Sequence, residues 1–197
     1  MSGLSETLRI AKAENFHLIP IRKNEKRPLR KNWDKERLEL DMVKWYIKKE
    51  FNLGVVGGIQ SMKDGYKLAI ADFDSRIGGD YIEYYRSFQT LVAFTPRGFH
   101  AYFRTNNRKL QSPFLNEVHR SPWTSQAEVD NVRFSSMYVL LPPSKVGYCE
   151  CGHSLDKHDS IQTDSCGKID CSCSKYELKE TKSYWWLDSG NQGIRKI

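Results

Sequence analysis

The 197-residue sequence lacks long apolar runs: the longest, such as Met137–Leu141, hold four or five residues. A transmembrane helix needs about 20 consecutive apolar residues, so no membrane span is expected. The first 16 residues are polar and mixed in charge, without the apolar core of a secretory signal, which predicts an intracellular protein. Glycine (13 residues) and proline (7 residues) are few, and there is neither an internal repeat nor a low-complexity segment. This composition excludes fibrous and disordered classes and predicts a single domain over residues 1–197.

Basic residues outnumber acidic ones, 31 against 24, which gives a net charge of +7. Part of this excess lies in residues 22–37, which hold eight basic and three acidic side chains. A stretch of this density attracts nucleic-acid backbones or anionic membranes, although a merely solvated loop has the same composition. Nearby Trp33 and Trp45 could stack on bases, but core packing explains them equally well. The candidate nucleic-acid-binding residues are Lys26, Arg27, Arg30 and Lys31.

All five cysteines lie between residues 149 and 173. An odd number of clustered cysteines, in a chain without a recognisable secretion signal, argues against a disulfide framework and for a metal site. Structural zinc takes four ligands, commonly Cys and His, and residues 147–175 are predicted to be a zinc-binding insertion. The preferred ligands are Cys151, His158, Cys166 and Cys173, with Cys149, His153 and Cys171 as the alternatives.

Residues 67–74 form the clearest strand, apolar until its last residues, as expected of a central strand covered on both faces. Asp72 and Asp74 are two residues apart, so both carboxylates leave the same face. At a separation of about 4 Å and an effective dielectric of about 20 their repulsion is about 4 kcal/mol, which a cation would relieve. Two acids opening a surface turn are the alternative, but the buried character of 68–71 favours a Mg²⁺ or Mn²⁺ site.

The next strands carry phosphate-binding and acidic groups. Residues 90–95 and 98–104 predict a hairpin, in which alternation places His100, Tyr102 and Arg104 on one face and Arg97 in the turn. Imidazole and guanidinium groups suit the oxygens of a triphosphate. Residues 128–130 form a further short strand with two acids, Glu128 and Asp130. Spacing does not separate them, and we prefer Asp130 as the third carboxylate of a two-metal site.

The order of these motifs resembles a known family. Gly54–Gly58, Asp72-Phe-Asp74, the strand around His100, Val129-Asp130 and Tyr138–Ser144 together resemble the primase/polymerase (prim-pol) domain of the archaeo-eukaryotic primase superfamily, found in plasmid and viral replication proteins. The resemblance implies an α+β fold with an RRM-like palm: a mixed, mostly antiparallel sheet with helices packed on it. It also implies that Asp72, Asp74 and Asp130 hold divalent metals and that His100 contacts the incoming triphosphate.

We therefore expect a DNA primase/polymerase that joins dNTPs or NTPs on single-stranded DNA, with Mg²⁺ or Mn²⁺ at the active site and structural Zn²⁺ in the insertion. His100, Arg97 and Arg104 would bind the nucleotide. No P-loop is present, so a helicase would act from elsewhere in cis or in trans, and residues 188–197 read as a tail or linker. The alternatives are a non-catalytic, zinc-containing module that binds single-stranded nucleic acid and, with less support from the strand pattern, a nucleotide-sugar transferase that uses the DxD pair.

Overall fold

The structure is a computed structural model that describes residues 3–35, 37–58, 65–73, 85–86, 88–106, 131–133, 137–149, 151–154, 178–187 and 194–196. Its elements in chain order are α1 (Gly3–Glu14), β1 (Leu18–Ile21), the 3₁₀ turn η1 (Trp33–Lys35), α2 (Leu40–Lys48), β2 (Asn52–Val56), β3 (Lys67–Phe73), β4 (Val92–Phe94), β5 (Phe99–Thr105), β6 (Asn131–Arg133), β7 (Tyr138–Leu141), β8 (Lys145–Cys149), β9 (Leu178–Ser183), β10 (Trp185–Trp186) and β11 (Arg195–Lys196). The predicted mixed α+β class is confirmed.

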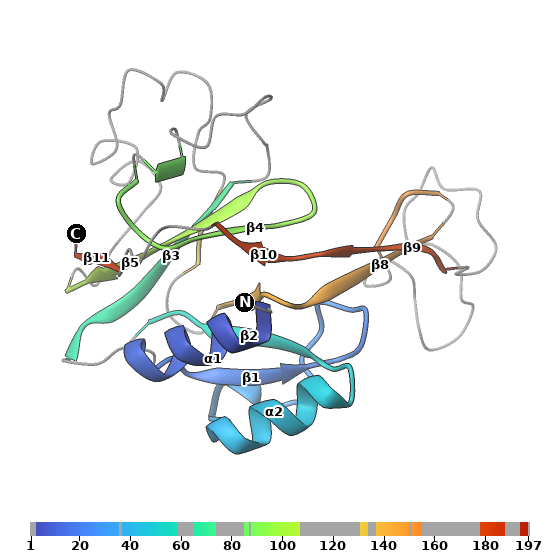
Figure 1. Cartoon of the computed structure of the whole chain (residues 1–197), viewed down its shortest axis with the longest axis horizontal. Helices are drawn as coiled ribbons and strands as arrows, with labels where there is room; N and C mark the ends of the chain where they lie inside the picture. Colours follow the sequence, from blue (N-terminus) through green and yellow to red (C-terminus); the bar gives the residue numbers. More distant parts are fainter. Residues whose placement is uncertain are drawn as a thin grey trace.

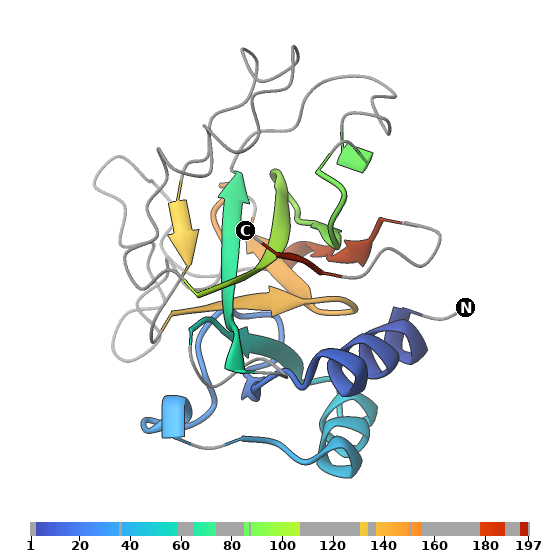
Figure 2. The same cartoon turned by 90° about the vertical axis from the view of Figure 1, so that its left-hand side faces the viewer.

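Three sheets hold these strands. The first has the order β1-β2-β7, the second β10-β4-β5-β3-β6 with β11 beside β5, and the third is the β8–β9 hairpin. All pairings are antiparallel except that of β11 with β5. In Figures 1 and 2, α2 lies below the first sheet, and β3, β4 and β5 lie above it. The sheet that carries the predicted acidic strand is therefore separated from α2 by the first sheet.

Both faces of the second sheet are buried, as the apolar run in β3 predicts. Alternate residues of β3 and β5 join one core cluster, formed by Ala69, Ala71, Phe73, Phe99, Ala101 and Phe103 with Val92, Tyr85, Phe88 and Leu187. The residues between them, Leu68, Ile70 and Tyr102, belong to a second cluster, which extends through the first sheet to α1 and α2. Period-two alternation in two directly paired strands sorts the side chains in this way.

Helix α2 buries a narrow apolar side against the first sheet. α2 buries Val43 and Tyr46, three residues apart, while its other residues are partly or fully exposed. It ends at Lys48, and Glu50 follows with a φ of 62°, a left-handed conformation that turns the chain into β2. Neither helix is long and apolar enough to span a membrane, among the residues that the structure describes.

The cysteine-containing segment begins and ends on one hairpin. β8 pairs with β9 from Lys145 opposite Ser183 to Cys149 opposite Leu178. β8 and β9, the strands on either side of this segment, therefore lie side by side in the hairpin at the right of Figure 1. Residues 155–177 lie outside the described residues, and the zinc-binding part of the predicted fold stays a prediction.

Candidate active site

Asp72 and His100 lie together at one end of the second sheet. They are directly opposite one another in the β3–β5 register, and directly opposed residues of antiparallel strands project from the same face. His100 Nε2 lies 3.3 Å from Asp72 Oδ1, and the side chains are 6% and 13% exposed. The other ring nitrogen, Nδ1, is buried without a hydrogen-bond partner in the described residues. The pair therefore combines a carboxylate with an imidazole that has one uncommitted nitrogen.

β6, which follows the third sequence motif along the chain, begins at the same end of the sheet. Asn131, its first residue, pairs with Asp72 on the side of β3 opposite to β5. Because both pairings are antiparallel, the end of β3 lies beside the beginnings of β5 and β6. Asp74 and Asp130 lie outside the described residues. In sequence, however, Asp74 is the first residue after β3, and Asp130 directly precedes β6.

Two tyrosines border the Asp72–His100 pair. The Tyr184 ring centroid lies 6.0 Å from that of His100, and both Tyr184 and Tyr102 are buried. Burial raises the pKa of Tyr102 well above its ordinary value of 10.0, and the nearby Tyr184 and Asp72 raise it further. Tyr102 is therefore a neutral phenol at physiological pH. Tyr184 was not among the predicted site residues, because it lies between β9 and β10 and nothing in the sequence around it indicates that it would contact His100.

The Pro142-Pro143-Ser144 turn connects the first sheet to Tyr184. The Ser144 hydroxyl accepts the backbone N–H of Leu53 at 3.0 Å and donates to the Leu53 carbonyl at 3.1 Å. The Ser144 carbonyl accepts the backbone N–H of Tyr184 at 2.9 Å. Thr7 of α1 donates to the Pro142 carbonyl at 2.5 Å. The Pro142–Pro143 bond in this turn is cis. The turn, which is one of the motifs of the sequence resemblance, thus forms hydrogen bonds to β2, to α1 and to Tyr184 beside His100.

The two arginines predicted to bind a triphosphate are separated. Arg97 is exposed in the turn of the β4–β5 hairpin, where its N–H and that of Gly98 point to the Thr95 hydroxyl at 3.3 and 2.9 Å. Arg104 lies four residues along β5 from His100, about 13 Å at strand spacing. It forms an ion pair with Glu14 at the end of α1. The structure does not bring Arg104 to the Asp72–His100 pair, because α1 covers the part of the sheet where it lies.

The basic segment, residues 22–37, folds back along β1. The Arg22 N–H donates to the Arg27 carbonyl at 3.0 Å, and the Leu29 N–H donates to the Pro20 carbonyl at 2.9 Å. Arg30 and Lys31 are exposed, whereas Lys26 and Arg27 are partly buried. The two tryptophans differ: Trp33 is half-buried with its ring edge against Tyr138, while Trp45 on α2 is 49% exposed. Core packing therefore accounts for Trp33 and not for Trp45.

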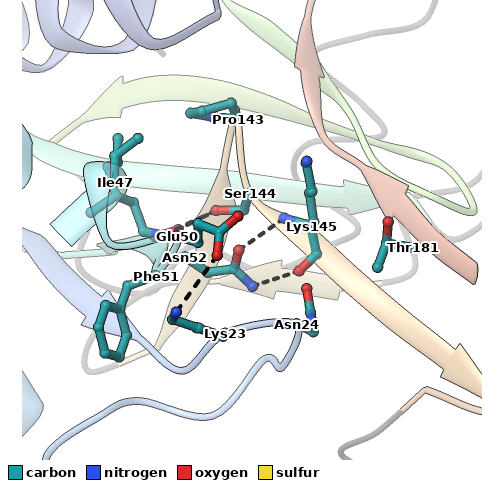
Figure 3. A pocket seen from close by; sticks show the side chains of 11 residues that line it. Lys23, Asn24, Ile47, Glu50, Phe51, Asn52, Pro143, Ser144, Lys145 and Thr181 are labelled. Atoms are coloured by element: carbon teal, nitrogen blue, oxygen red, sulfur yellow. Dashed lines mark hydrogen bonds and ion pairs between the residues drawn. The ribbon is translucent and has the colours of Figure 1, made fainter. Parts of the chain in front are cut away.

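A pocket of about 440 Å³ lies between the basic segment, the end of α2 and the start of β8. Figure 3 shows its lining side chains, which include Lys23, Glu50, Phe51 and Lys145. Asn52 forms its floor: its amide donates to the Lys145 carbonyl at 2.6 Å and accepts the Lys145 N–H at 2.9 Å. Lys23 lies 3.6 Å from the Glu50 carboxylate and 5.6 Å from the centre of the Phe51 ring. The pocket lining is mixed, with charged groups on one side and an aromatic wall.

The described cysteines correct one expectation. Cys149 and Cys151 are joined in a disulfide, whereas the sequence argument treated them as separate thiols available to zinc. The reason is local: Cys149 ends β8, and the Gly152 N–H donates to the Cys149 carbonyl at 2.9 Å, which closes a turn that holds the two cysteines together. His153 Nδ1 lies 3.4 Å from Cys151 Sγ. The part of the chain that the structure describes contains no group of three or more potential metal ligands. The candidates His158, Cys166, Cys171 and Cys173 lie outside it.

Comparison with known proteins supports the motif order. Residues 7–157 match the family model Prim-Pol, which is described as the N-terminal part of bifunctional DNA primase/polymerase. The match includes β3, β5, β6 and the Pro142-Pro143-Ser144 turn. No curated protein matches the chain in sequence.

Proposed function

The chain belongs to the Prim-Pol family of bifunctional DNA primase/polymerases, and from this premise we propose that it joins nucleotides on a single-stranded DNA template by a two-metal mechanism. One observation carries the proposal: Asp72 and His100, from two motifs 28 residues apart in sequence, face one another at 3.3 Å. This contact lies at the end of the sheet where β6 begins, and Asp130 is the residue before β6 in sequence.

The donor set suits a divalent metal that binds oxygen. Asp72, Asp74 and Asp130 would hold Mg²⁺ or Mn²⁺, which would make the attacking 3′-hydroxyl more acidic and offset charge on the triphosphate. Asp72 is largely buried, and a buried carboxylate needs a nearby positive charge or donor. His100 supplies one such group through Nε2. Its other ring nitrogen, Nδ1, has no hydrogen-bond partner in the described residues and would contact a phosphate oxygen of the nucleotide.

The surrounding groups would position the substrate. Tyr102 stays neutral beside Asp72, so it adds no negative charge near the triphosphate. Arg97, exposed in the hairpin turn, can reach toward a bound nucleotide, whereas Arg104 is neutralised by Glu14 and is left out of the proposed site. The basic segment would bind the template backbone through Lys26, Arg27, Arg30 and Lys31. A helicase in cis or in trans would supply the single-stranded template.

The test is nucleotide incorporation on unprimed single-stranded DNA with Mn²⁺ or Mg²⁺ and labelled nucleotides, resolved on a denaturing gel. Asp72→Asn keeps the shape of the side chain and removes its charge, so we expect incorporation to fall by at least about 100-fold. The control is Glu180→Gln on β9, an exposed acid outside the proposed site, which should stay near wild type. Asp72→Asn with more than about one hundredth of wild-type activity would contradict the assignment. A wild-type protein that binds the DNA but incorporates nothing would favour a non-catalytic binding module.

We also propose a structural zinc site in the cysteine-containing segment. With Cys149 and Cys151 joined, the remaining ligands of the predicted kind are His158, Cys166, Cys171 and Cys173, with His153 as a fifth candidate. Zinc content by mass spectrometry should fall to background in Cys166→Ser/Cys173→Ser and stay unchanged in Cys149→Ser/Cys151→Ser. Loss of zinc from the second variant alone would show that the disulfide cysteines are the ligands after all.

A further inference from the structure

The exposed side of α2 has an unusual composition. Its described residues outside the core include Trp45, 49% exposed, and Met42, 45% exposed. The helix spacing i, i+3 and i, i+4 places Lys48 and Lys49 next to Trp45 on this side. We call Met42, Lys44, Trp45, Lys48 and Lys49 the α2 surface. It combines a half-exposed indole with three exposed ammonium groups, and the exposed carboxylate of Asp41, one turn before Trp45, lies on the same side of the helix.

We propose that the α2 surface binds single-stranded nucleic acid, with a base stacked on Trp45 and the backbone phosphates on Lys48 and Lys49. The inference rests on the proposed function, because it assigns a further contact for the same template. Stacking on an exposed aromatic ring, combined with nearby cations, is the usual means of binding a single strand without reading its sequence. Neither element alone would suffice: the indole supplies the stacking face, and the lysines supply the charge.

The positive charge of Lys48 and Lys49 favours a nucleic acid over an apolar protein as the partner of the α2 surface. Lys44 lies 3.6 Å from the Asp41 carboxylate, but neither Lys48 nor Lys49 has a carboxylate partner in the described part of the chain. An apolar protein surface docked on Trp45 would leave these ammonium groups desolvated and unpaired, which is costly. A polyanion instead neutralises them and releases its counterions, which favours binding.

The pocket described above lies between the end of α2 and the basic segment. The Trp45 ring centroid lies 5.0 Å from that of Tyr46, which lies 5.5 Å from Phe51 in the wall of the pocket. Lys23, near the beginning of the basic segment, also lines the pocket, and its ammonium group lies over the Phe51 ring. A row of ring contacts through the buried Tyr46 therefore links Trp45 to the pocket, where Glu50 is the acidic side chain beside Lys23.

The position of α2 predicts which step the contact affects. The first sheet separates α2 from β3 and β5, so Trp45 cannot touch the nucleotide at Asp72 (Figures 1 and 2). The α2 surface should hold the template at a distance from the reacting nucleotide. Its loss should raise the KM for a long template and leave kcat unchanged.

The closing experiment compares two tryptophans of similar exposure. Trp45→Ala should weaken binding to a fluorescently labelled single strand of about 30 nucleotides by about tenfold, a value in the lower part of the range for base–aromatic stacking. Trp185→Ala, at a residue 44% exposed on β10, is the matched control and should bind like wild type. Trp45→Phe keeps a stacking ring and should recover most of the affinity. Thermal unfolding of each variant separates loss of folding from loss of contact.

The lysines give an independent readout. Lys48→Gln should reduce the slope of log K against log salt by about 0.7, the value for one phosphate contact on a single strand, whereas Lys12→Gln on the exposed side of α1 should not. Equal effects of Lys48→Gln and Lys12→Gln, or wild-type binding by a folded Trp45→Ala, would overturn the proposal. Failure of the proposed function has a different signature: no incorporation by the wild type, while Trp45→Ala still weakens DNA binding.

Discussion

The ion pair between Arg104 and Glu14 provides the most direct test of how this sheet is built. Its side chains are 17% and 11% exposed, and it joins β5 to the end of α1, 90 residues away in sequence. Breaking a buried pair by removing one partner costs about 3–5 kcal/mol, and the remaining exposure puts this pair near the lower limit. We therefore expect Arg104→Met to destabilise the fold by about 3 kcal/mol, because it leaves the Glu14 carboxylate buried without a partner.

In a chain of this length 1 kcal/mol corresponds to about 2–4 °C, so the midpoint of thermal unfolding should fall by about 6–12 °C. Glu14→Leu should cost a similar amount. The double variant Arg104→Met/Glu14→Leu should recover much of the loss, because two apolar side chains can replace a buried pair. The surface pair Arg9–Glu6 is the matched control: Arg9 is half exposed, and Arg9→Met should change stability by less than about 1 kcal/mol.

The assay is thermal unfolding followed by circular dichroism, together with nucleotide binding at a temperature where every variant is folded. The reasoning is refuted if Arg104→Met unfolds within about 1 °C of wild type and binds nucleoside triphosphate more weakly. That result would indicate that Arg104 binds the phosphates of the nucleotide, as strand alternation predicts.

Two further predictions concern buried positions. The folded-state pKa of Tyr102 is raised above its unfolded value, so stability should fall as pH rises above about 10, by about 1.4 kcal/mol per pH unit, and Tyr102→Phe should remove this loss in alkaline urea titrations. At neutral pH Tyr102→Phe should be neutral or slightly stabilising, because the buried hydroxyl has no partner in the described residues; a loss above about 1 kcal/mol would reveal one. Gly54→Ala would place a Cβ 3.1 Å from Ile19 Cγ1 and 3.2 Å from Ile21 Cδ1, and overpacking of this kind costs about 1–3 kcal/mol. Ile21→Val removes the second contact, so the double variant should lose less than the sum of the singles in urea unfolding; strict additivity would contradict the packing argument.

Much of the sheet could be predicted from local pattern. The apolar run of β3 indicates a strand buried on both faces, and alternation in β5 places His100, Tyr102 and Arg104 on one side. Both follow from the period of two, which is a property of the extended backbone. The same pattern cannot indicate what covers each face, and Arg104 was therefore assigned to an open site although α1 covers it.

The tryptophans and the cysteines also differ from the sequence-based prediction because of contacts that the local pattern does not specify. Exposure of Trp45 and burial of Trp33 depend on which side of α2 and of the basic segment meets the first sheet, and both tryptophans look alike in the sequence. Likewise, the turn at Gly152 joins Cys149 to Cys151, which cysteine spacing alone had assigned to metal.

The amino-acid order thus specified which strands form, which side chains share a face and the succession of acidic and histidine motifs, since these depend on neighbours along the backbone. Packing specified the partners: His100 for Asp72, Glu14 for Arg104, and Tyr184 beside the imidazole. Such contacts join segments up to 90 residues apart, and their free energy exists only once the sheets and helices have buried those side chains against one another.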